Sequence, residues 1–372
     1  MKIMKIAIID ADLISRKRHR FPNLASMKIS GYYKKLGHEV ELKLDYDNLD
    51  KYDKVFISKV FTDTPIDEEI LKLDNVEYGG TGFFYDDAPD LPYEIEHQFP
   101  DYNLYDEWVQ GEIARGIKPI NFDDYLNSSI GFITRGCFRK CGFCVNKKYN
   151  KAFESSPINE FLDITRKKIS LWDDNFLAHP NWRELLTSLE ETKKPFQFRQ
   201  GLDIRLMTKE KAERFSKVKY SGDFIFAFDF VKDKEIIEEK LRIWKEYVSK
   251  TTKLYVFCGY DREEKWDDEF WLQDIIDVFE RIKILMKHGC IPYITRYFRY
   301  EESPYRGMYI NLARWCNQPS MFKKNSFRQY CRDVKGNGEG SAAMRYLTEF
   351  ENKYPDVAKK YFDLRYEDLK EI

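Results

Sequence analysis

The chain has 372 residues, 43% of them hydrophobic, so it is long enough for two domains with well-filled cores. Its 62 basic and 63 acidic residues nearly cancel, which excludes a general electrostatic preference for nucleic acid or anionic membranes. No apolar run approaches the ~20 residues that cross a bilayer. Seven cysteines without a secretion signal indicate thiols or metal ligands rather than disulfides. We therefore expect a cytoplasmic protein with no membrane partner.

The first 80 residues alternate short apolar runs with amphipathic stretches. KIAIID, HEVELK, KVFISKV and NVEYGG indicate strands, and LASMKISGYYKKLG indicates a helix after the first of them. Strands separated by helices predict a parallel, doubly wound sheet of the Rossmann type over residues 1–80. Residues 81–127 are acidic and rich in Pro and Tyr, which predicts a linker that wraps the surface.

Six further apolar runs follow the predicted linker: SIGFIT, KISLWDD, PFQFRQG, DFIFAFDF, TKLYVFCGYD and CIPYITRYF. Each run but the last precedes a helical pattern, the first of them near residues 156–168. This order predicts a partial (β/α)6 barrel of the TIM type over residues 128–302, with the site at the carboxyl ends of its strands. Residues 303–372 show helical patches and are predicted to form a helical carboxyl-terminal extension.

The stretch RGCFRKCGFCV places Cys137, Cys141 and Cys144 in one loop with the spacing C-x3-C-x2-C. Three thiolates can hold three irons of a cubane iron–sulfur cluster and leave the fourth iron open, whereas complete ligation by protein takes four cysteines. The loop follows the first strand of the predicted barrel, where this architecture places its active site. An open iron can bind a substrate or a cofactor.

The cysteine loop resembles the signature of the radical S-adenosylmethionine (radical SAM) enzymes, Cys-x3-Cys-x-aromatic-Cys, with Phe143 at the aromatic position. The resemblance implies a 4Fe-4S cluster ligated by the three cysteines, with SAM chelated to the open iron and Phe143 packed near the adenine. It also implies that one electron cleaves SAM to methionine and a 5'-deoxyadenosyl radical, which abstracts hydrogen from a substrate. An electron donor similar to flavodoxin or ferredoxin is then expected as a partner.

A structural zinc site is the competing interpretation of the same loop. It needs four tetrahedral Cys or His ligands, and the next residue of either type, His179, lies 35 positions after Cys144. Spacing, strand context and the aromatic residue together favour the cluster. Cys258 and Cys290 lie in or beside apolar runs and are expected in the core. Cys316 and Cys331 are too few to bind a second cluster and are expected to be buried thiols.

The second barrel strand is predicted to end in ISLWDDNF, which places two carboxylates and an amide at the rim. This segment resembles the one that binds the amino group of SAM in radical SAM enzymes, where it is often Gly-Gly-Glu-like. Trp172 and Asp173 replace the glycines here, which departs from the pattern for direct backbone pairing. Asp173, Asp174 and Asn175 are still the residues of this segment that we expect to contact the cofactor. The competing interpretation is an ordinary turn ahead of the helix that opens near Pro180.

The third strand, in FQFRQGLDIR, resembles the corresponding segment of cobalamin-type and methylthiotransferase-like radical SAM enzymes. It places Arg199 and Gln200 at the rim, and either Arg199 or Arg205 could hold the cofactor carboxylate in a bidentate fork. A surface salt bridge is the competing interpretation of each arginine. Asp229, in FAFDF, also falls at a strand end and is a further candidate for cofactor binding.

The amino-terminal sheet followed by a barrel resembles the cobalamin-binding group of radical SAM enzymes over most of residues 1–300. That group usually carries Asp-x-His-x-x-Gly after the first strand, with the histidine ligating cobalt. Here DADLIS keeps Asp10 but has Asp12 at the histidine position, and a carboxylate is a harder ligand than imidazole. The glycine pair of NVEYGG matches a later motif of the group. We expect a domain that kept the fold and lost cobalamin, with cobalamin binding as the competing interpretation.

Residues 293–345 contain ten Lys or Arg against four acidic residues, with aromatic residues interleaved. Positive charge and exposed rings suit RNA or another anionic partner, but amphipathic helices over a core give the same composition. The aromatic residues are Tyr297, Phe298, Tyr300, Tyr305, Tyr309, Trp315, Phe322, Phe327 and Tyr330.

The sequence thus predicts a radical SAM enzyme that acts on an unidentified substrate, which could be RNA, a peptide or a small metabolite. Two other hypotheses stay open. One is a cobalamin-dependent radical SAM methylase, and the other is a non-catalytic zinc-stabilised module that binds nucleic acid through its basic tail.

Overall fold

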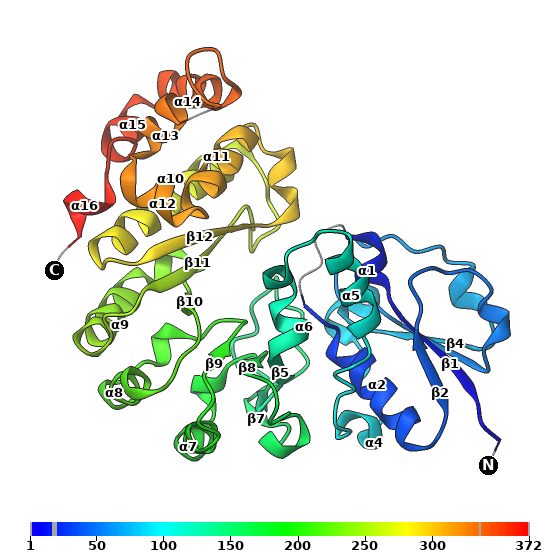
Figure 1. The fold of residues 1–372 in the computed structure, drawn as a ribbon. Coiled ribbons are helices and arrows are strands. Elements are labelled where there is room, and N and C mark those ends of the chain that lie inside the picture. The colour runs from blue at the N-terminus through cyan, green and yellow to red at the C-terminus, as the bar shows by residue number, and fades with distance from the viewer. Residues whose placement is uncertain (1, 17–20, 335, 371–372) are drawn as a thin grey trace. The chain divides into compact units, whose positions relative to one another are not determined.

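A computed structural model describes residues 2–16, 21–334 and 336–370 (Figure 1). The chain divides into two compact units between Arg199 and Gln200. Both units combine helices with parallel strands, which confirms the mixed α/β class. The division falls within the segment predicted to form the barrel. The six predicted strands of that segment form two sheets of three strands, one sheet in each unit. In the described ranges no helix is long and apolar enough to span a membrane.

The first unit begins with a four-stranded parallel sheet in the order β2-β1-β3-β4. The central strand β1 is buried at every position after Lys5, as expected of a strand covered on both faces. The strands are β1 (Lys5–Asp10), β2 (Glu39–Leu42), β3 (Lys54–Ser58) and β4 (Val76–Gly79), and the helices that follow β1 are α1 (Ala11–Ser15) and α2 (Leu24–Lys35).

The segment 81–127, predicted to be a surface linker, contributes to the core of the first unit. Its apolar side chains pack with α2 against the face of the sheet that carries Ile6 and Ile8. Its many tyrosines fit this position because they have large apolar rings and polar tips that can find hydrogen bonds. Its helices are α3 (Thr81–Phe84), α4 (Tyr93–Glu96), α5 (Asp106–Ala114) and α6 (Asp123–Asn127), and its buried residues include Ile95, Tyr102, Leu104, Tyr105, Val109, Phe122 and Tyr125.

A second parallel sheet completes the first unit, in the order β5-β8-β9. Its strands are β5 (Ser128–Gly131), β8 (Lys168–Leu171) and β9 (Phe196–Phe198), with α7 (Trp182–Glu191) between the last two. Two short strands, β6 (Thr134–Arg135) and β7 (Phe153–Glu154), form a separate antiparallel pair.

The helix predicted near residues 156–168 is absent, so that prediction was wrong. A single 3-10 turn stands there, at Ile158–Glu160. The chain then turns inward so that Phe161 fills the space above Gly131, where a Cβ would lie 2.4 Å from the phenyl ring. Asp163 holds the next turn by accepting from the N–H of Thr165 (2.8 Å). The packing of Phe161 against Gly131, 30 positions away, outweighs the helical preference of the sequence.

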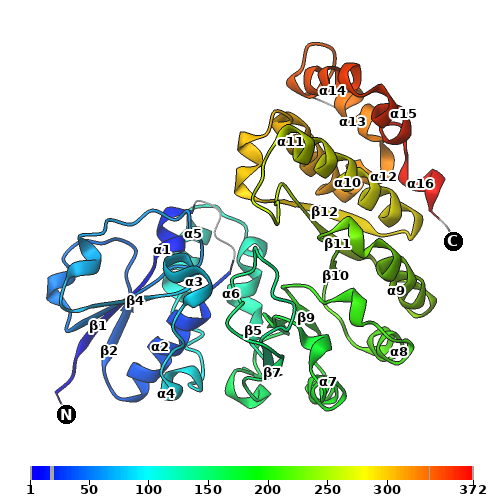
Figure 2. The same cartoon turned by 180° about the vertical axis from the view of Figure 1, so that it is seen from behind.

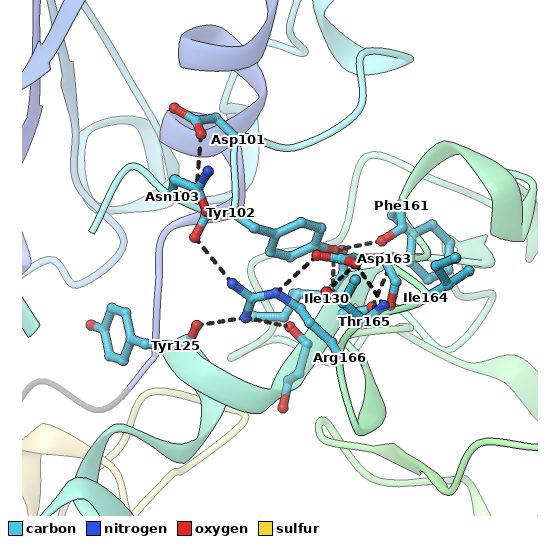
Figure 3. A network of polar contacts seen from close by, with 12 residues as sticks. Asp101, Tyr102, Asn103, Tyr125, Ile130, Phe161, Asp163, Ile164, Thr165 and Arg166 are labelled. Atoms are coloured by element: carbon cyan, nitrogen blue, oxygen red, sulfur yellow. Dashed lines mark hydrogen bonds and ion pairs between the residues drawn. The ribbon is translucent and has the colours of Figure 1, made fainter. Parts of the chain in front are cut away.

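A buried arginine joins the 81–127 segment to the second sheet (Figure 3). Arg166 donates through Nη1 to the carbonyls of Tyr125 (2.5 Å) and Ser128 (3.2 Å), and through Nη2 to the carbonyl of Tyr102 (3.1 Å). Its guanidinium lies 4.3 Å from the centre of the Tyr102 ring, and Nε lies 3.5 Å from the Asp163 carboxylate. One side chain therefore satisfies three backbone carbonyls in the interior.

The Tyr102 hydroxyl completes this network. It accepts from the N–H of Ile130 in β5 (2.8 Å) and donates to the carbonyl of Phe161 (2.6 Å). The 81–127 segment is thereby tied to β5 and to the turn that replaces the predicted helix.

The second unit contains a parallel sheet in the order β10-β11-β12. Figures 1 and 2 show α8 and α9 on the same side of this sheet, where Trp244 of α9 packs against the rings of Phe224 and Phe226. The strands are β10 (Phe224–Ala227), β11 (Thr252–Cys258) and β12 (Ile291–Arg296), and the helices between them are α8 (Lys209–Lys217), α9 (Lys234–Tyr247) and α10 (Asp268–Lys287).

The carboxyl-terminal part of the second unit is helical, as predicted. Helix α11 packs against β12, and α15 and α16 pack against α10. The helices are α11 (Arg306–Cys316), α12 (Pro319–Lys324), α13 (Phe327–Asp333), α14 (Ala342–Lys353), α15 (Pro355–Tyr361) and α16 (Tyr366–Leu369).

Candidate functional site

The three cysteines of the C-x3-C-x2-C motif lie in one loop of the first unit. The cysteine loop spans residues 136–152 and is closed at its base by the β6–β7 pair, in which Arg135 is paired with Phe153. It leaves the sheet just after the carboxyl end of β5. This is the end of a parallel sheet at which α/β folds place their binding sites.

Backbone hydrogen bonds shape the loop around its sulfur atoms. The N–H of Cys144 donates to the carbonyl of Cys141 (3.0 Å), which closes a turn between these two residues. The Sγ atoms of Cys137 and Cys144 accept from the backbone N–H groups of Arg139 and Asn146, each at 3.4 Å. Such donors favour thiolate sulfur, and hydrogen bonds to ligand sulfur are one way in which proteins set cluster potentials.

The donor set of the loop is soft sulfur. All three cysteines are half-buried, and burial raises the pKa of the Cys144 thiol above its usual range. No three His, Cys, Asp or Glu side chains within the described ranges are grouped so as to hold one metal ion. A cubane cluster takes one cysteine per iron and so spreads its ligands over several metal atoms. Three thiols in one loop fit that kind of group.

Asp173, just after β8, anchors the chain that leads into the loop. It accepts from the N–H (2.6 Å) and the hydroxyl (2.7 Å) of Thr134 and from the N–H of Ile133 (3.3 Å). The side chain is 1% exposed, and burial raises its pKa to about 7 even though these hydrogen bonds oppose the shift. Both of its oxygens are engaged by the protein, and its contact with a cofactor stays a prediction.

Asp174 fixes the cysteine stretch at both ends. It accepts from the N–H of Gly136 (2.6 Å) and from the side-chain amide of Asn146 (2.5 Å). Gly136 directly precedes Cys137, and Asn146 lies two residues after Cys144. One carboxylate therefore sets the span over which the three sulfur atoms are presented.

Asn175 touches a cysteine and keeps one polar atom unused. Its Nδ2 donates to Cys137 Sγ (3.2 Å), and its side chain is 2% exposed. Its Oδ1 is buried and has no hydrogen-bond partner. A buried acceptor left in this state costs ~1–3 kcal/mol, which a ligand with a suitable donor would recover.

Two buried donors without partners belong to residues that flank the loop. Arg135 Nε lies at the base of the loop, and Trp172 Nε1 belongs to the residue that follows β8. Together with Asn175 they account for three of the five such atoms in the described part of the chain. Two donors and one acceptor are complementary to a ligand that carries both a carboxylate and an ammonium group.

Two other predicted site residues of the first unit make contacts within the protein. Arg199 pairs through Nη2 with Asp124 (3.0 Å), and its guanidinium lies 5.9 Å from the centre of the Trp172 ring. Phe143 is half-buried, and its carbonyl accepts from the hydroxyl of Tyr85 (2.7 Å). The salt bridge considered for Arg199 therefore exists.

Gln200, Arg205 and Asp229 belong to the second unit. Arg205 pairs through Nε with Asp203 and through Nη1 with Asp233, each at 2.7 Å, so protein carboxylates occupy its fork. Asp229 follows β10, and burial raises its pKa to about 6 despite the opposing effect of nearby arginines. It is a carboxyl group that can change its charge close to neutral pH.

Asp12 stands where the cobalamin-binding group carries its histidine. Its carboxylate is buried and accepts from the N–H of Val60 (2.6 Å) and from the hydroxyl of Thr64. Turning it outward to a metal would leave both donors unsatisfied. A Cβ on Gly80 would lie 2.3 Å from the carbonyl oxygen of Lys59, so close packing explains that glycine. The residues present do not fit a cobalt-ligating site at this position.

Most aromatic residues of the basic carboxyl-terminal region are buried and cannot stack on bases. Tyr297 and Tyr300 are half-buried, and Phe298 is 69% exposed. The buried ones are Tyr305, Tyr309, Trp315, Phe322, Phe327 and Tyr330. The burial of these rings favours the interpretation that competed with RNA binding, namely amphipathic helices over a core.

Sequence reasoning did not single out Thr134, Asn146 or Tyr85 as part of the site. Thr134 and Asn146 have no motif of their own, since they matter through contacts with carboxylates about 30 to 40 residues away. Tyr85 could have been noticed from charge, because the acidic stretch around it precedes a loop that contains only basic charges.

No protein-family model matches the chain, and no curated protein matches its sequence. The structure is similar to that of the radical SAM methyltransferase TsrM from Kitasatospora setae with cobalamin and a [4Fe-4S] cluster bound. The TM-score is 0.50 and the identity 12%, over 79% of this chain and 72% of that one. The same enzyme with tryptophan substrate and the SAM analogue aza-SAM gives a TM-score of 0.49 and 12% identity, over 78% and 72% of the two chains.

SuiB from Streptococcus suis gives a TM-score of 0.34 and 14% identity, over 73% of this chain and 61% of that one. The match to TsrM at 12% identity is a match of folds. At the level of the fold, it confirms the resemblance to the cobalamin-binding group of radical SAM proteins that the order of the elements had indicated.

Proposed function

We propose that this chain is a radical SAM enzyme that holds a 4Fe-4S cluster through Cys137, Cys141 and Cys144. The cysteine loop carries the proposal, because it offers three sulfur ligands in one stretch beyond β5 and a cluster so bound keeps one iron open. When bound, such a cluster supplies the electron that cleaves SAM to methionine and a 5'-deoxyadenosyl radical, which takes hydrogen from the substrate. A flavodoxin- or ferredoxin-like protein would be the electron donor.

We assign the buried atoms without partners to the methionyl end of SAM. Asn175 Oδ1 would accept from its ammonium group, while Arg135 Nε and Trp172 Nε1 would donate to its carboxylate. The bond from Asn175 Nδ2 to Cys137 Sγ supports this, since it keeps the free amide oxygen beside a cluster ligand. Phe143 is assigned to the adenine by resemblance.

Asp173 and Asp174 would serve the cofactor through the loop that they hold. Their four oxygens are occupied by the chain on either side of the cysteines, so they orient the ligands. We also propose that Arg199, Gln200, Arg205 and Asp229 bind the cofactor.

The domain division is a further proposal. We propose a division into residues 1–80, 81–127, 128–302 and 303–372, with a barrel in the third segment.

No cobalt chemistry enters this proposal, because Asp12 is committed to Val60 and Thr64. The competing cobalamin-dependent methylase therefore needs a different cobalt ligand or none. Its test is the cobalt content of protein expressed with added cobalamin.

The decisive experiment is anaerobic reconstitution with iron and sulfide, followed by metal analysis and reduction with dithionite in the presence of SAM. We expect about four irons per chain, no zinc, and release of 5'-deoxyadenosine. Single Cys→Ala changes at 137, 141 and 144 should abolish both cluster and cleavage. Cys290→Ala, at a buried thiol of the second unit, is the matched control and should change neither. An intact cluster that never cleaves SAM, or one zinc with no iron, would refute the proposal.

Asn175→Leu tests the assignment of the ammonium group. Losing one hydrogen bond to a charged donor costs ~1.5–3 kcal/mol, so SAM affinity should fall roughly 10- to 150-fold while the iron content is kept. Equilibrium dialysis of SAM against reconstituted protein measures this. Asn181→Leu changes an exposed asparagine bonded to Glu154 and is the control. Equal affinity in both variants would remove Asn175 from the site.

A further inference from the structure

A short acidic segment of the first unit lies across the cysteine loop. Residues 85–90, here called the acidic strap, follow β4 and α3 and precede α4. Four of its residues contact the loop. The contacts are Tyr85 Oη to the Phe143 carbonyl (2.7 Å), Asp86 to Lys147 (2.9 Å), Asp90 to Lys148 (2.6 Å) and to the Tyr149 hydroxyl (3.0 Å), and the Ala88 carbonyl to Lys148 Nζ (3.0 Å).

The two segments have opposite charge. The cysteine loop, residues 136–152, contains five Lys or Arg and no acidic residue, whereas the strap contains three Asp among six residues and no basic one. The loop would repel itself if its lysines were left unpaired, because like charges crowd within a short span. Asp86 and Asp90 relieve this at Lys147 and Lys148, just beyond the last cysteine.

Among the strap residues, Tyr85 makes the hydrogen bond that lies nearest in the chain to a proposed cluster ligand. Its hydroxyl holds the carbonyl of Phe143, and that carbonyl belongs to the same peptide group as the N–H of Cys144. The N–H in turn donates to the carbonyl of Cys141 (3.0 Å). Tyr85 therefore fixes the orientation of the peptide plane between two of the proposed ligands.

The backbone of Tyr85 is strained, with φ +48° and ψ −113°. A non-glycine residue in a sparsely populated region costs on the order of 1–3 kcal/mol and persists only where its surroundings impose it. The imposed feature here is the direction of the Tyr85 side chain, which reaches the loop. Strain of this kind is concentrated at functional sites.

We propose that the acidic strap positions the cysteine loop for its cluster, with Tyr85 as a positioning residue that acts through the Phe143–Cys144 peptide. The inference rests on the proposed function, since the cluster is the group being positioned. It also gives the amino-terminal domain a role without cobalamin. Five residues separate Gly79, the end of β4, from Tyr85, so the sheet provides a rigid base for the strap.

Trypsin digestion of the full chain tests the strap without reference to any metal. The cysteine loop has five Lys or Arg sites, and we expect Tyr85→Phe and the double variant Asp86→Asn/Asp90→Asn to be cleaved there about 10-fold faster than the wild type, because local opening exposes the sites. Tyr93→Phe, at a tyrosine of α4 that is 73% exposed and lies just beyond the strap, is the control and should match the wild type. Unchanged cleavage in both strap variants overturns the proposal.

Reconstituted protein then tests the positioning of the cluster. We expect Tyr85→Phe to bind the same amount of iron, to lose it to a chelator about 10-fold faster, and to show a shifted reduction potential and electron paramagnetic resonance spectrum. A variant that is merely less stable would lose iron without a shift in potential, and that result would overturn the role of Tyr85. If the wild type binds no iron, the proposed function fails. In that case, faster trypsin cleavage of the variants would still show that the strap holds the loop, but the proposal that it positions a cluster would be refuted.

Discussion

Removing the guanidinium of Arg166 should weaken the first unit more than any surface change of equal size. Arg166→Met keeps a long unbranched side chain and takes away the donors to the carbonyls of Tyr102, Tyr125 and Ser128. All three acceptor residues are buried. Water therefore cannot replace the lost donors without opening the contact between the 81–127 segment and β5.

The expected magnitude follows from opposing effects. Three buried carbonyls left without donors cost ~1–3 kcal/mol each, and the lost contact over the Tyr102 ring adds ~1 kcal/mol. Against this, the variant no longer buries a charge, and burial already lowers the pKa of Arg166. Removing one partner of a buried charged pair typically costs ~3–5 kcal/mol, even though a buried charge is removed with it. We expect a loss in that range.

Urea unfolding followed by circular dichroism measures the loss. The midpoint of the first unit's transition should fall while its slope against urea stays the same. Arg115→Met is the matched control, because Arg115 is 77% exposed and its partner Glu112 lies one turn away on α5. The control should lose less than ~0.5 kcal/mol. A loss below ~1 kcal/mol for Arg166→Met, or equal losses in the two variants, would refute the reasoning.

Three further changes test the site and its base. The change Asp173→Asn removes a carboxyl group whose pKa is raised to about 7 by burial. The folded wild type binds this proton more tightly than the unfolded chain, so its stability should fall by up to ~4 kcal/mol as the pH rises from ~4 to ~7. Urea unfolding of the variant should lack that fall, and an identical pH dependence would contradict the assignment. Gly136→Ala puts a Cβ 2.3 Å from the Lys151 carbonyl oxygen at φ +86° and should reduce the iron retained after reconstitution. Gly111→Ala has nothing within 4 Å of the new Cβ and should retain as much iron as the wild type; equal iron in both variants would show that the loop tolerates the change. Asp12→Ala leaves two donors without an acceptor and should cost ~2–4 kcal/mol in urea unfolding, and a cost under ~1 kcal/mol would show that the carboxylate is not needed there.

The strands were predictable because each is a short run of branched and aromatic residues bounded by turn residues. KIAIID and KVFIS became β1 and β3 because an apolar run that is buried on both faces needs no partner-specific information. The 156–168 segment failed for the opposite reason. Its helical pattern is local, whereas the fit of Phe161 over Gly131 is a contact between positions 30 apart, and propensity yields to such packing.

The segment 81–127 shows a different limit of composition. Its acidic residues, prolines and tyrosines are those of a surface linker, and only the contacts of Tyr102 and Tyr105 reveal that the rings point inward. Tyr105 donates to Asp10 (2.9 Å) at the end of β1. A tyrosine on a surface and a tyrosine in a core are the same letter in a sequence, because the ring is apolar and the hydroxyl is polar.

For the candidate site, the spacing of the cysteines and their place after β5 could be predicted, since both are local features. The different contacts of Asp173, Asp174 and Asn175 could not be predicted. All three are polar residues at a strand end, and they differ only in what the folded chain leaves them to bond. Asn175 stands apart because its carbonyl oxygen is the atom for which the protein provides no partner.

The Tyr102 hydroxyl has a consequence for solubility. Strand β5 is the terminal strand of its sheet, hydrogen-bonded to β8 along one side. An outer strand with open N–H groups can recruit a strand from another molecule and start aggregation. Here the Tyr102 hydroxyl accepts from the N–H of Ile130, so this donor of β5 is not open to a strand from another molecule.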